Sequence, residues 1–203
     1  MQAGNDVRGL EVAIKNIINA SYSRDLSAKI AAADHVMQKK GMYLGGYRPF
    51  GFLPDPNDCH KLILDPVASQ YVRLIFELAL QGNRTGTIAK ILNEKKIPTP
   101  AAYHVAENHV YSEQKAWDLQ RSHWTSGTVY HILKNEKYVG DALLQKTFTV
   151  DCITHKVVKN NGERPMYLIT DHHTPIIDRD TFNRVQQEIA RRSSKRKISD
   201  HTK

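Results

Sequence analysis

The first forty residues carry their apolar side chains only as narrow stripes. From Tyr22 to Lys40 these positions recur every three or four residues, which predicts a helix of about five turns. A shorter helix is predicted before it, from Leu10 to Ala20, and Gly41 is the expected C-cap of the longer one. A helix with so thin a stripe buries little surface of its own. We therefore expect it to pack on something outside the chain, such as a partner subunit.

The composition changes after this helix. Residues 41–52, GMYLGGYRPFGF, hold four glycines, a proline and several aromatic residues around Arg48. We interpret them as a linker with two open roles. It is either a structural loop that enters a strand at residues 50–53, or a segment whose glycines allow close approach to another surface while Tyr47 and Arg48 bind it. Residues 54–64 then predict a small hairpin.

Two helices are predicted in the middle of the chain. The first starts at Asp65-Pro66, as N-cap and first helical residue, and stops at Gly82. The second is expected to be capped by Thr85 or Thr87 and to end before the Ile97-Pro98-Thr99-Pro100 segment. Residues 101–123 have no sustained period, so they are predicted to be an insertion or long loop, with a helical turn over residues 113–119.

Residues 124–140 predict a helix with two different faces. Val129, Ile132 and Leu133 form a short apolar face under Trp124. The opposite face is polar and has two interpretations. It is either a surface that contacts a DNA major groove or the solvated face of an ordinary helix, since both have the same pattern. Its members recur at helical spacing, with two further polar residues beside them: Ser126, Tyr130, Lys134 and Lys137, flanked by His131 and Asn135.

The last part of the chain is rich in strand signals. Strands are expected over residues 138–144, 147–153, 155–159 and 166–169, with a turn at Asn160-Asn161-Gly162, and a final helix begins at Asp178. The fold class predicted from all these elements is α+β: a mainly helical domain with a small antiparallel β-sheet, preceded by a long helix.

The charge of the chain favours a polyanion as its partner. It has 29 Lys and Arg against 21 Asp and Glu, a net charge of +8. Most of the excess lies in residues 191–203, which hold six basic residues and one acid and predict a disordered or linker segment, either merely solvated or in contact with DNA. The positions of the remaining charges therefore matter more than the total.

Other features exclude several classes of protein. No apolar run is long enough for a membrane span, and no signal peptide opens the chain. The two cysteines, Cys59 and Cys152, lie far apart, so neither a disulfide scaffold nor a four-cysteine zinc site is expected. We expect a cytoplasmic protein without a cofactor or metal.

Four motifs, in fixed order, resemble the large serine recombinases, the site-specific recombinases of integrative phages and mobile elements. They are GGYRPFGF, IAKILNEKKIPTP, WTSGTVYHILKNEKYVG and HHTPIIDRDTFNRVQQEIARR. Together with the helix before them, they extend the resemblance over about residues 20–192. Each motif alone is weak evidence, whereas the ordered series is fairly specific.

The resemblance implies a division of the chain into three parts. Residues 1–42 correspond to the end of the catalytic domain with its long exit helix, and residues 43–190 to the recombinase DNA-binding domain. Residues 191–203 are then the basic linker toward a zinc-ribbon domain, which two cysteines cannot form. The chain is expected to be the middle piece of a longer recombinase.

The resemblance also implies covalent catalysis by a serine outside this chain. In the family that serine attacks a DNA phosphodiester and forms a phosphoserine link, while arginines neutralise the phosphate. Ser21 and Ser23 lie at the start of the exit helix, so we interpret them as structural. No catalytic residue is predicted, and the chain alone is not expected to cut DNA.

Double-stranded DNA is the implied partner, with a homodimer or tetramer on DNA for the full-length protein. The linker is expected in the minor groove and the polar helix face in the major groove. Residues 97–124 separate the two helices of this unit, far more than the turn of a standard helix-turn-helix. The predicted DNA contacts are Lys39, Lys40, Gly45, Gly46, Tyr47, Arg48, Arg84, Thr125, Ser126, Tyr130, His131, Lys134, Asn135 and Lys137.

Two alternatives remain open from the residues. Ten histidines, including His172 and His173, suggest a metal-dependent nuclease, but none of them has ligand spacing on one helix. A helix-turn-helix transcriptional regulator would use the same helices, although the strand-rich second half argues against it.

Overall fold

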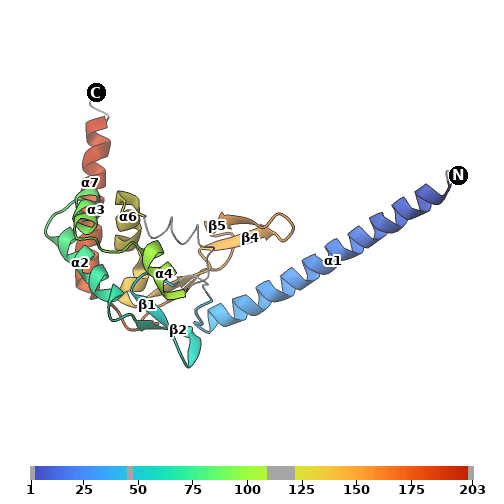
Figure 1. Cartoon of the computed structure of the whole chain (residues 1–203), viewed down its shortest axis with the longest axis horizontal. Coiled ribbons are helices and arrows are strands. Elements are labelled where there is room, and N and C mark those ends of the chain that lie inside the picture. The colour runs from blue at the N-terminus through green and yellow to red at the C-terminus, as the bar shows by residue number, and fades with distance from the viewer. Residues whose placement is uncertain (1–2, 45–47, 109–121, 201–203) are drawn as a thin grey trace. The chain divides into compact units, whose positions relative to one another are not determined.

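The computed structural model describes residues 3–44, 48–108 and 122–200 (Figure 1). The chain forms two compact units. We call the first, Met1–Leu44 with Ala142–Ile169, the helix–ribbon unit, and the second, Gly45–Asp141 with Thr170–Lys203, the helical unit. Among the helices of the described residues, none is both long and apolar enough to cross a membrane.

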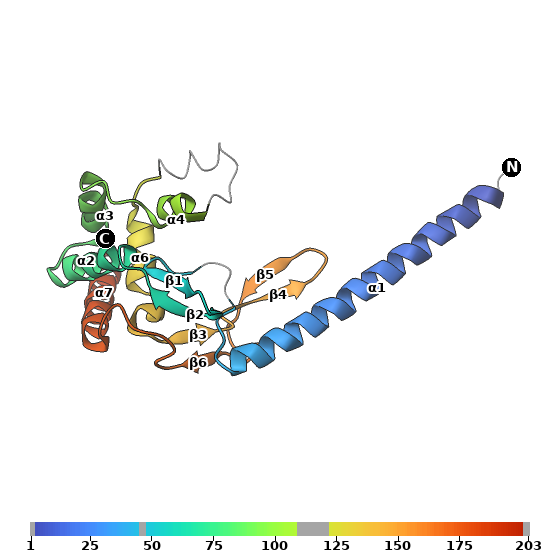
Figure 2. The same cartoon turned by 60° about the horizontal axis from the view of Figure 1, so that its bottom comes forward.

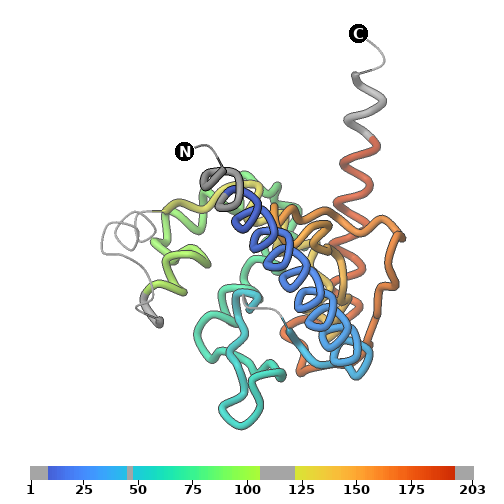
Figure 3. The backbone as a smooth tube through the Cα atoms, turned by 90° about the vertical axis from the view of Figure 1, so that its right-hand side faces the viewer, coloured from blue at the N-terminus to red at the C-terminus, as the bar shows by residue number. Residues whose placement is uncertain are grey.

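The helix–ribbon unit begins with α1, Ala3–Lys39, one uninterrupted helix (Figure 3). The predicted break between two helices near residue 21 is therefore wrong. No glycine or proline lies there, and pairs such as Lys29 with Asp25, one turn apart at 2.8 Å, support continuity. The predicted C-cap is confirmed: Gly41 has a φ of +80°, and the Met42 N–H returns to the Met37 carbonyl.

Two antiparallel strand pairs complete this unit (Figure 2). The pair β3, Ala142–Leu144, and β6, Tyr167–Ile169, lies against the end of α1, where the Tyr167 hydroxyl is 2.7 Å from His35 Nε2. The pair β4, Thr147–Asp151, and β5, Lys156–Lys159, forms a two-stranded ribbon. The buried Asn160 holds the loop between the two pairs, because its amide donates to the Gln145 and Arg164 carbonyls.

The strands are shorter than predicted, for local reasons. Residues 136–139 form a 3₁₀ helix, η1 (Glu136–Val139), which ends at Gly140 with a φ of +87°, so the predicted strand over residues 138–144 is reduced to β3. The Asp151 carboxylate accepts the N–H groups of Ile153 and Thr154, which turns the chain and ends β4 early.

The helical unit contains one hairpin and five α-helices among its described residues. The hairpin is β1, Phe52–Asp55, paired with β2, Asp58–Leu64, as predicted. The helices are α2, Ala68–Leu80; α3, Thr85–Glu94; α4, Pro100–Asn108; α6, Ser126–Leu133; and α7, Arg179–Asp200.

A single core joins these helices. The largest fully buried side chains come from α2, α3, α6, η1 and α7: Tyr138, Phe76, Ile75, Ile88, Leu92, Leu133, Val72, Val129 and Val185. Burial raises the pKa of the Tyr138 hydroxyl, so this group stays neutral in the core. The start of α7 is fixed separately, since Arg179 donates to both Asp141 carboxylate oxygens at 2.6 and 2.9 Å.

The ends of three helices can be compared with the predictions from the sequence. Asp65 caps α2 as predicted, since its carboxylate accepts the Val67 and Ala68 N–H groups, although the helix is assigned from Ala68. The predicted cap of α3 by Thr85 or Thr87 is wrong, because Arg84 is the N-cap and its side chain makes no cap bond. Disorder after residue 190, one of the two expectations for this segment, is also wrong, because α7 continues to Asp200, whereas its role as a linker stays a prediction.

Helix α4 replaces the first part of the predicted long loop. Over residues 100–105, where its side chains are described, the buried ones are Ala102 and Val105, three residues apart, too short a pattern to stand out in the sequence. Tyr103 anchors it by donating its hydroxyl to the buried Asp65 carboxylate at 2.9 Å. The predicted turn over residues 113–119 lies outside the described residues.

Candidate nucleic-acid interface

Helices α3 and α6 pack directly on each other, although a long segment separates them in sequence. Asn93, on α3, joins them with both ends of its amide. Its Oδ1 accepts the Trp124 N–H at 2.9 Å, and its Nδ2 donates to the Trp124 carbonyl at 3.0 Å. The Trp124 indole donates to the Ile97 carbonyl at 2.9 Å and is itself buried. The two helices therefore pack as one unit, although α4 and the following segment lie between them in the sequence.

The first turns of the two helices lie side by side. The Thr85 and Ser126 hydroxyls are 2.6 Å apart, and each residue is followed by glycine and threonine. A Cβ added at Gly86 would meet no atom within 4 Å, and one at Gly127 only the Thr125 hydroxyl at 3.7 Å. Neither glycine has a positive φ, so neither is required by packing or by backbone geometry within the described residues. Sequence analysis missed this arrangement, although the triplets Thr-Gly-Thr and Ser-Gly-Thr are a visible signal.

Helix α6 has the two faces that the sequence predicted. Val129, Ile132 and Leu133 are buried. The other side exposes Ser126, Tyr130, His131 and Lys134, with Tyr130 42% exposed. Thr125 caps the helix by accepting the Thr128 N–H, and Gln186 of α7 donates to the Leu133 carbonyl at 2.6 Å. Both ends of α6 are thus fixed, and its polar face is held outward.

The predicted alignment of Lys137 with this face is wrong, because α6 ends at Leu133. Lys134 is its C-cap, and Asn135 has an extended backbone. The Asn135 side chain accepts the Lys137 N–H at 3.2 Å and so caps η1. Lys137 therefore lies on η1, beside α6 and not along it. DNA contact by Asn135 or Lys137 stays a prediction.

The loop before α3 is held by α7. Arg192 donates to the Gly82 and Asn83 carbonyls at 2.7 and 3.1 Å, and to Glu188 at 2.6 Å. Hydrogen bonds from Arg191 and Arg192 lower the pKa of Glu188 to about 2. The next residue, Arg84, is exposed at the start of α3. This candidate contact therefore sits on a fixed loop, near the paired first turns.

The linker is anchored by Phe50. Its ring packs on Tyr71, Tyr103 and Trp124, with ring centroids 5.5 to 6.4 Å apart. Arg48, two residues earlier, is partly buried, and its Nε has no hydrogen-bond partner within the described parts of the chain. Gly45, Gly46 and Tyr47 lie outside the described residues. Lys39 and Lys40 belong to the helix–ribbon unit, where both are exposed at the end of α1.

The histidines do not assemble a metal site in residues 3–44, 48–108 and 122–200, where no three potential ligands come together. His173 donates its Nε2–H to the Lys137 carbonyl at 2.7 Å, so its Nδ1 accepts from His172 Nδ1 at 3.0 Å. Burial lowers the pKa of His173, which keeps the ring neutral. This pair serves to fix η1 to the segment before α7.

Comparison with known proteins identifies the family. The family model "Recombinase" matches residues 66–192, from the start of α2 to the interior of α7. The chain therefore belongs to the recombinase family. The resemblance to the large serine recombinases, predicted from the motif series, is confirmed by this match.

Solved structures give more distant similarities. The "Crystal Structure of a LSR-DNA Complex" is 17% identical, with a TM-score of 0.49 over 80% of this chain. A structure described as "Sequence Requirements of the Listeria innocua prophage attP site" is also 17% identical, with a TM-score of 0.47 over 80% of this chain. The chain spans 39% and 52% of the length of these two proteins. The family match alone carries the assignment.

Proposed function

We propose that this chain is the sequence-specific DNA-binding portion of a site-specific serine recombinase, with double-stranded DNA as its partner. The observation that carries the proposal is α6, whose buried face is fixed on α3 while its polar face is exposed. The exposed side offers a hydroxyl, a phenol, an imidazole and an ammonium group. No acidic residue occurs from Ser126 to Asn135. These groups are suited to base edges and phosphates in a major groove.

The paired first turns of α3 and α6 support a close approach to a DNA strand. Helix N-termini attract phosphates, because their first N–H groups have no partner within the helix. Gly86 and Gly127 add no side chain to these first turns, at a cost of about 1 kcal/mol each in helix propensity relative to Ala. Arg84 adds an exposed cation beside them. A phosphate partner gives both glycines a purpose that packing does not.

The linker is proposed to enter the adjacent minor groove. Arg48 carries an Nε donor without a partner within the described parts of the chain, two residues before the anchored Phe50. A narrow minor groove concentrates negative potential and favours an inserted arginine. Gly45, Gly46 and Tyr47, whose role rests on sequence alone, complete this contact, and Lys39 and Lys40 contact phosphates.

The proposed reaction belongs to the longer protein. A serine outside this chain would form the phosphoserine intermediate, and a homodimer or tetramer would exchange the strands. In the proposed division, residues 1–42 end the catalytic domain, residues 43–190 bind DNA, and residues 191–203 lead onward. The exposed apolar side chains of α1, such as Leu10, Ile17 and Tyr22 at 60–70% exposure, support self-association along this helix.

The direct test is selection of duplexes from a random library with the purified chain. We expect one short sequence to be enriched. Tyr130→Ala and Lys134→Ala should each weaken binding to it by about 1 to 3 kcal/mol in fluorescence anisotropy. Lys61→Ala, an exposed lysine on β2, is the matched control and should change nothing. Failure to enrich any sequence would overturn the proposal.

A further inference from the structure

We infer that the β4–β5 ribbon is a second DNA-backbone contact, outside the helix pair and the linker. The inference rests on the proposed function and adds to it a surface that belongs to the helix–ribbon unit. The ribbon's own strand register, charges and packing carry the argument.

One face of the ribbon is exposed along its whole length. The register places Thr147 opposite Lys159, and Thr149 opposite Val157. Because side chains alternate along a strand, these four lie on one face, and all four are exposed. The face offers two hydroxyls and one ammonium group, which are donors typical of contacts to phosphate oxygens. Val157, 60% exposed, lies between them and supplies a contact for the sugars.

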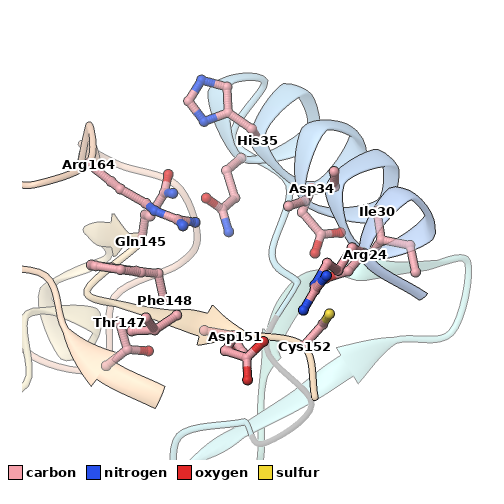
Figure 4. A pocket seen from close by; sticks show the side chains of 16 residues that line it. Arg24, Ile30, Asp34, His35, Gln145, Thr147, Phe148, Asp151, Cys152 and Arg164 are labelled. Atoms are coloured by element: carbon pink, nitrogen blue, oxygen red, sulfur yellow. The ribbon is translucent and has the colours of Figure 1, made fainter. Parts of the chain in front are cut away.

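The other face is held from within its own unit. Phe148 and Val158 are opposite each other and partly buried. The Arg164 guanidinium lies 4.2 Å from the centroid of the Phe148 ring, and this residue pair lies at the edge of a cleft of about 580 Å³ between α1 and the ribbon (Figure 4). The Phe148 face is therefore turned toward its own unit and partly covered by Arg164. The Thr147 face is the one that remains open to a partner.

The charges of the ribbon favour a polyanion. Lys156 and Lys159 are both exposed on β5, but only Lys159 lies on the Thr147 face, because Lys156 alternates to the other face, opposite Asp151. The acids of this region are engaged locally: Asp151 accepts N–H groups of its own turn, and Glu163 accepts the Asn161 N–H at 2.6 Å. Lys159 therefore presents positive charge on the Thr147 face, without an ion pair among the described residues.

Salt dependence separates this role from the other function of lysines on an edge strand, which is to prevent strands from pairing between molecules. Each phosphate contact contributes about 0.9 to the slope of log K against log salt. The variant Lys159→Gln should therefore lower this slope by about one. Anisotropy of a fluorescein-labelled duplex of mixed sequence, over a series of NaCl concentrations, measures it.

The matched control is Lys29→Gln, which removes the same charge from an exposed lysine that is paired with Asp25 on α1. Its slope should equal that of the wild type. An unchanged slope for the ribbon variant, or an equal loss in the control, would overturn the inference. Self-association of the ribbon variant in light scattering, without a change in slope, would also overturn the inference. That result would show that the lysine prevents strand pairing between molecules.

Two further measurements keep the outcomes distinct. Lys156→Gln removes the same charge from the other face of β5 and should leave the slope unchanged, and Lys159→Arg, which keeps the charge, decides the question if circular dichroism finds Lys159→Gln unfolded. A wild-type chain that selects no sequence but keeps a salt-dependent, ribbon-sensitive affinity would overturn the proposed function and support the ribbon contact. A wild-type chain that binds no duplex at any salt overturns both.

Discussion

Asn93 should control the pairing of α3 and α6, because it closes the split turn between them. Its amide makes two hydrogen bonds to the backbone of Trp124, at 2.9 and 3.0 Å, and Trp124 is only 3% exposed. Asn93→Ala leaves a backbone N–H and carbonyl without these partners. A lost hydrogen bond costs about 0.5 to 1.5 kcal/mol, and more when the remaining group is buried. We expect a total loss of about 2 to 3 kcal/mol in the free energy of unfolding.

The loss is measurable by urea denaturation, followed through tryptophan fluorescence. Asn93→Asp keeps the acceptor for the Trp124 N–H but places a carboxylate oxygen against the Trp124 carbonyl, so it should cost at least as much as Asn93→Ala. Gln187→Ala, which removes an exposed amide on α7, is the control and should stay within about 0.5 kcal/mol of wild type.

DNA binding gives the second readout for Asn93. In the folded fraction of Asn93→Ala, the start of α6 keeps only the Thr85–Ser126 hydroxyl contact to α3 and loses the two bonds at Trp124, so affinity for the selected duplex should fall by about tenfold, equivalent to about 1.4 kcal/mol. Increased hydrogen exchange at the Trp124 amide would localise the effect. Unchanged stability together with unchanged exchange would refute the reasoning.

Three further predictions concern the supports of the helical unit. Burial lowers the pKa of His173, so the folded state binds fewer protons than the unfolded state as pH falls below about 6.5. The urea midpoint should therefore drop between pH 7 and pH 5, and His173→Gln should reduce that drop. The hydrogen bond from Arg179 holds the pKa of Asp141 below its usual range, so the stabilisation from this pair is present at neutral pH and is lost as pH falls below about 4. Asp141→Asn should therefore lower the urea midpoint at pH 7 and reduce the further loss of stability in acid. Gly51 has a φ of +97°, and an added Cβ would lie 2.8 Å from Ile176 Cδ1, so Gly51→Ala should lower the thermal midpoint measurably, whereas Gly82→Ala, at positive φ with open space, should lower it less.

Local patterns were sufficient where an element contains its own signals. Helix α2 has a capping Asp65, a stop at Gly82 and a regular apolar face, and all three hold in the structure. The two faces of α6 were likewise readable, because burial on one side and polarity on the other follow from helical spacing alone. The ordered motifs identified the recombinase family, because the order of motifs along a chain can be read without its structure.

Contacts between distant residues were not readable. The pairing of α3 with α6 depends on Asn93 meeting Trp124, which are separated by α4 and the following segment. Arg192 reaches the end of α2 from α7, and Arg179 reaches Asp141. The sequence offers many asparagines and arginines of the same kind, and no local rule selects the partner of each one.

The amino-acid sequence by itself determined the helix periods, the caps with nearby partners, the polar face of α6 and the family. The tertiary structure alone decided that the split helices form one unit and that the first turns of α3 and α6 meet. It also decided that the Thr147 face of the β4–β5 ribbon is exposed. The physical reason is range: propensity and periodicity act over a few residues, whereas hydrogen bonds between remote segments exist only after the core has brought them together.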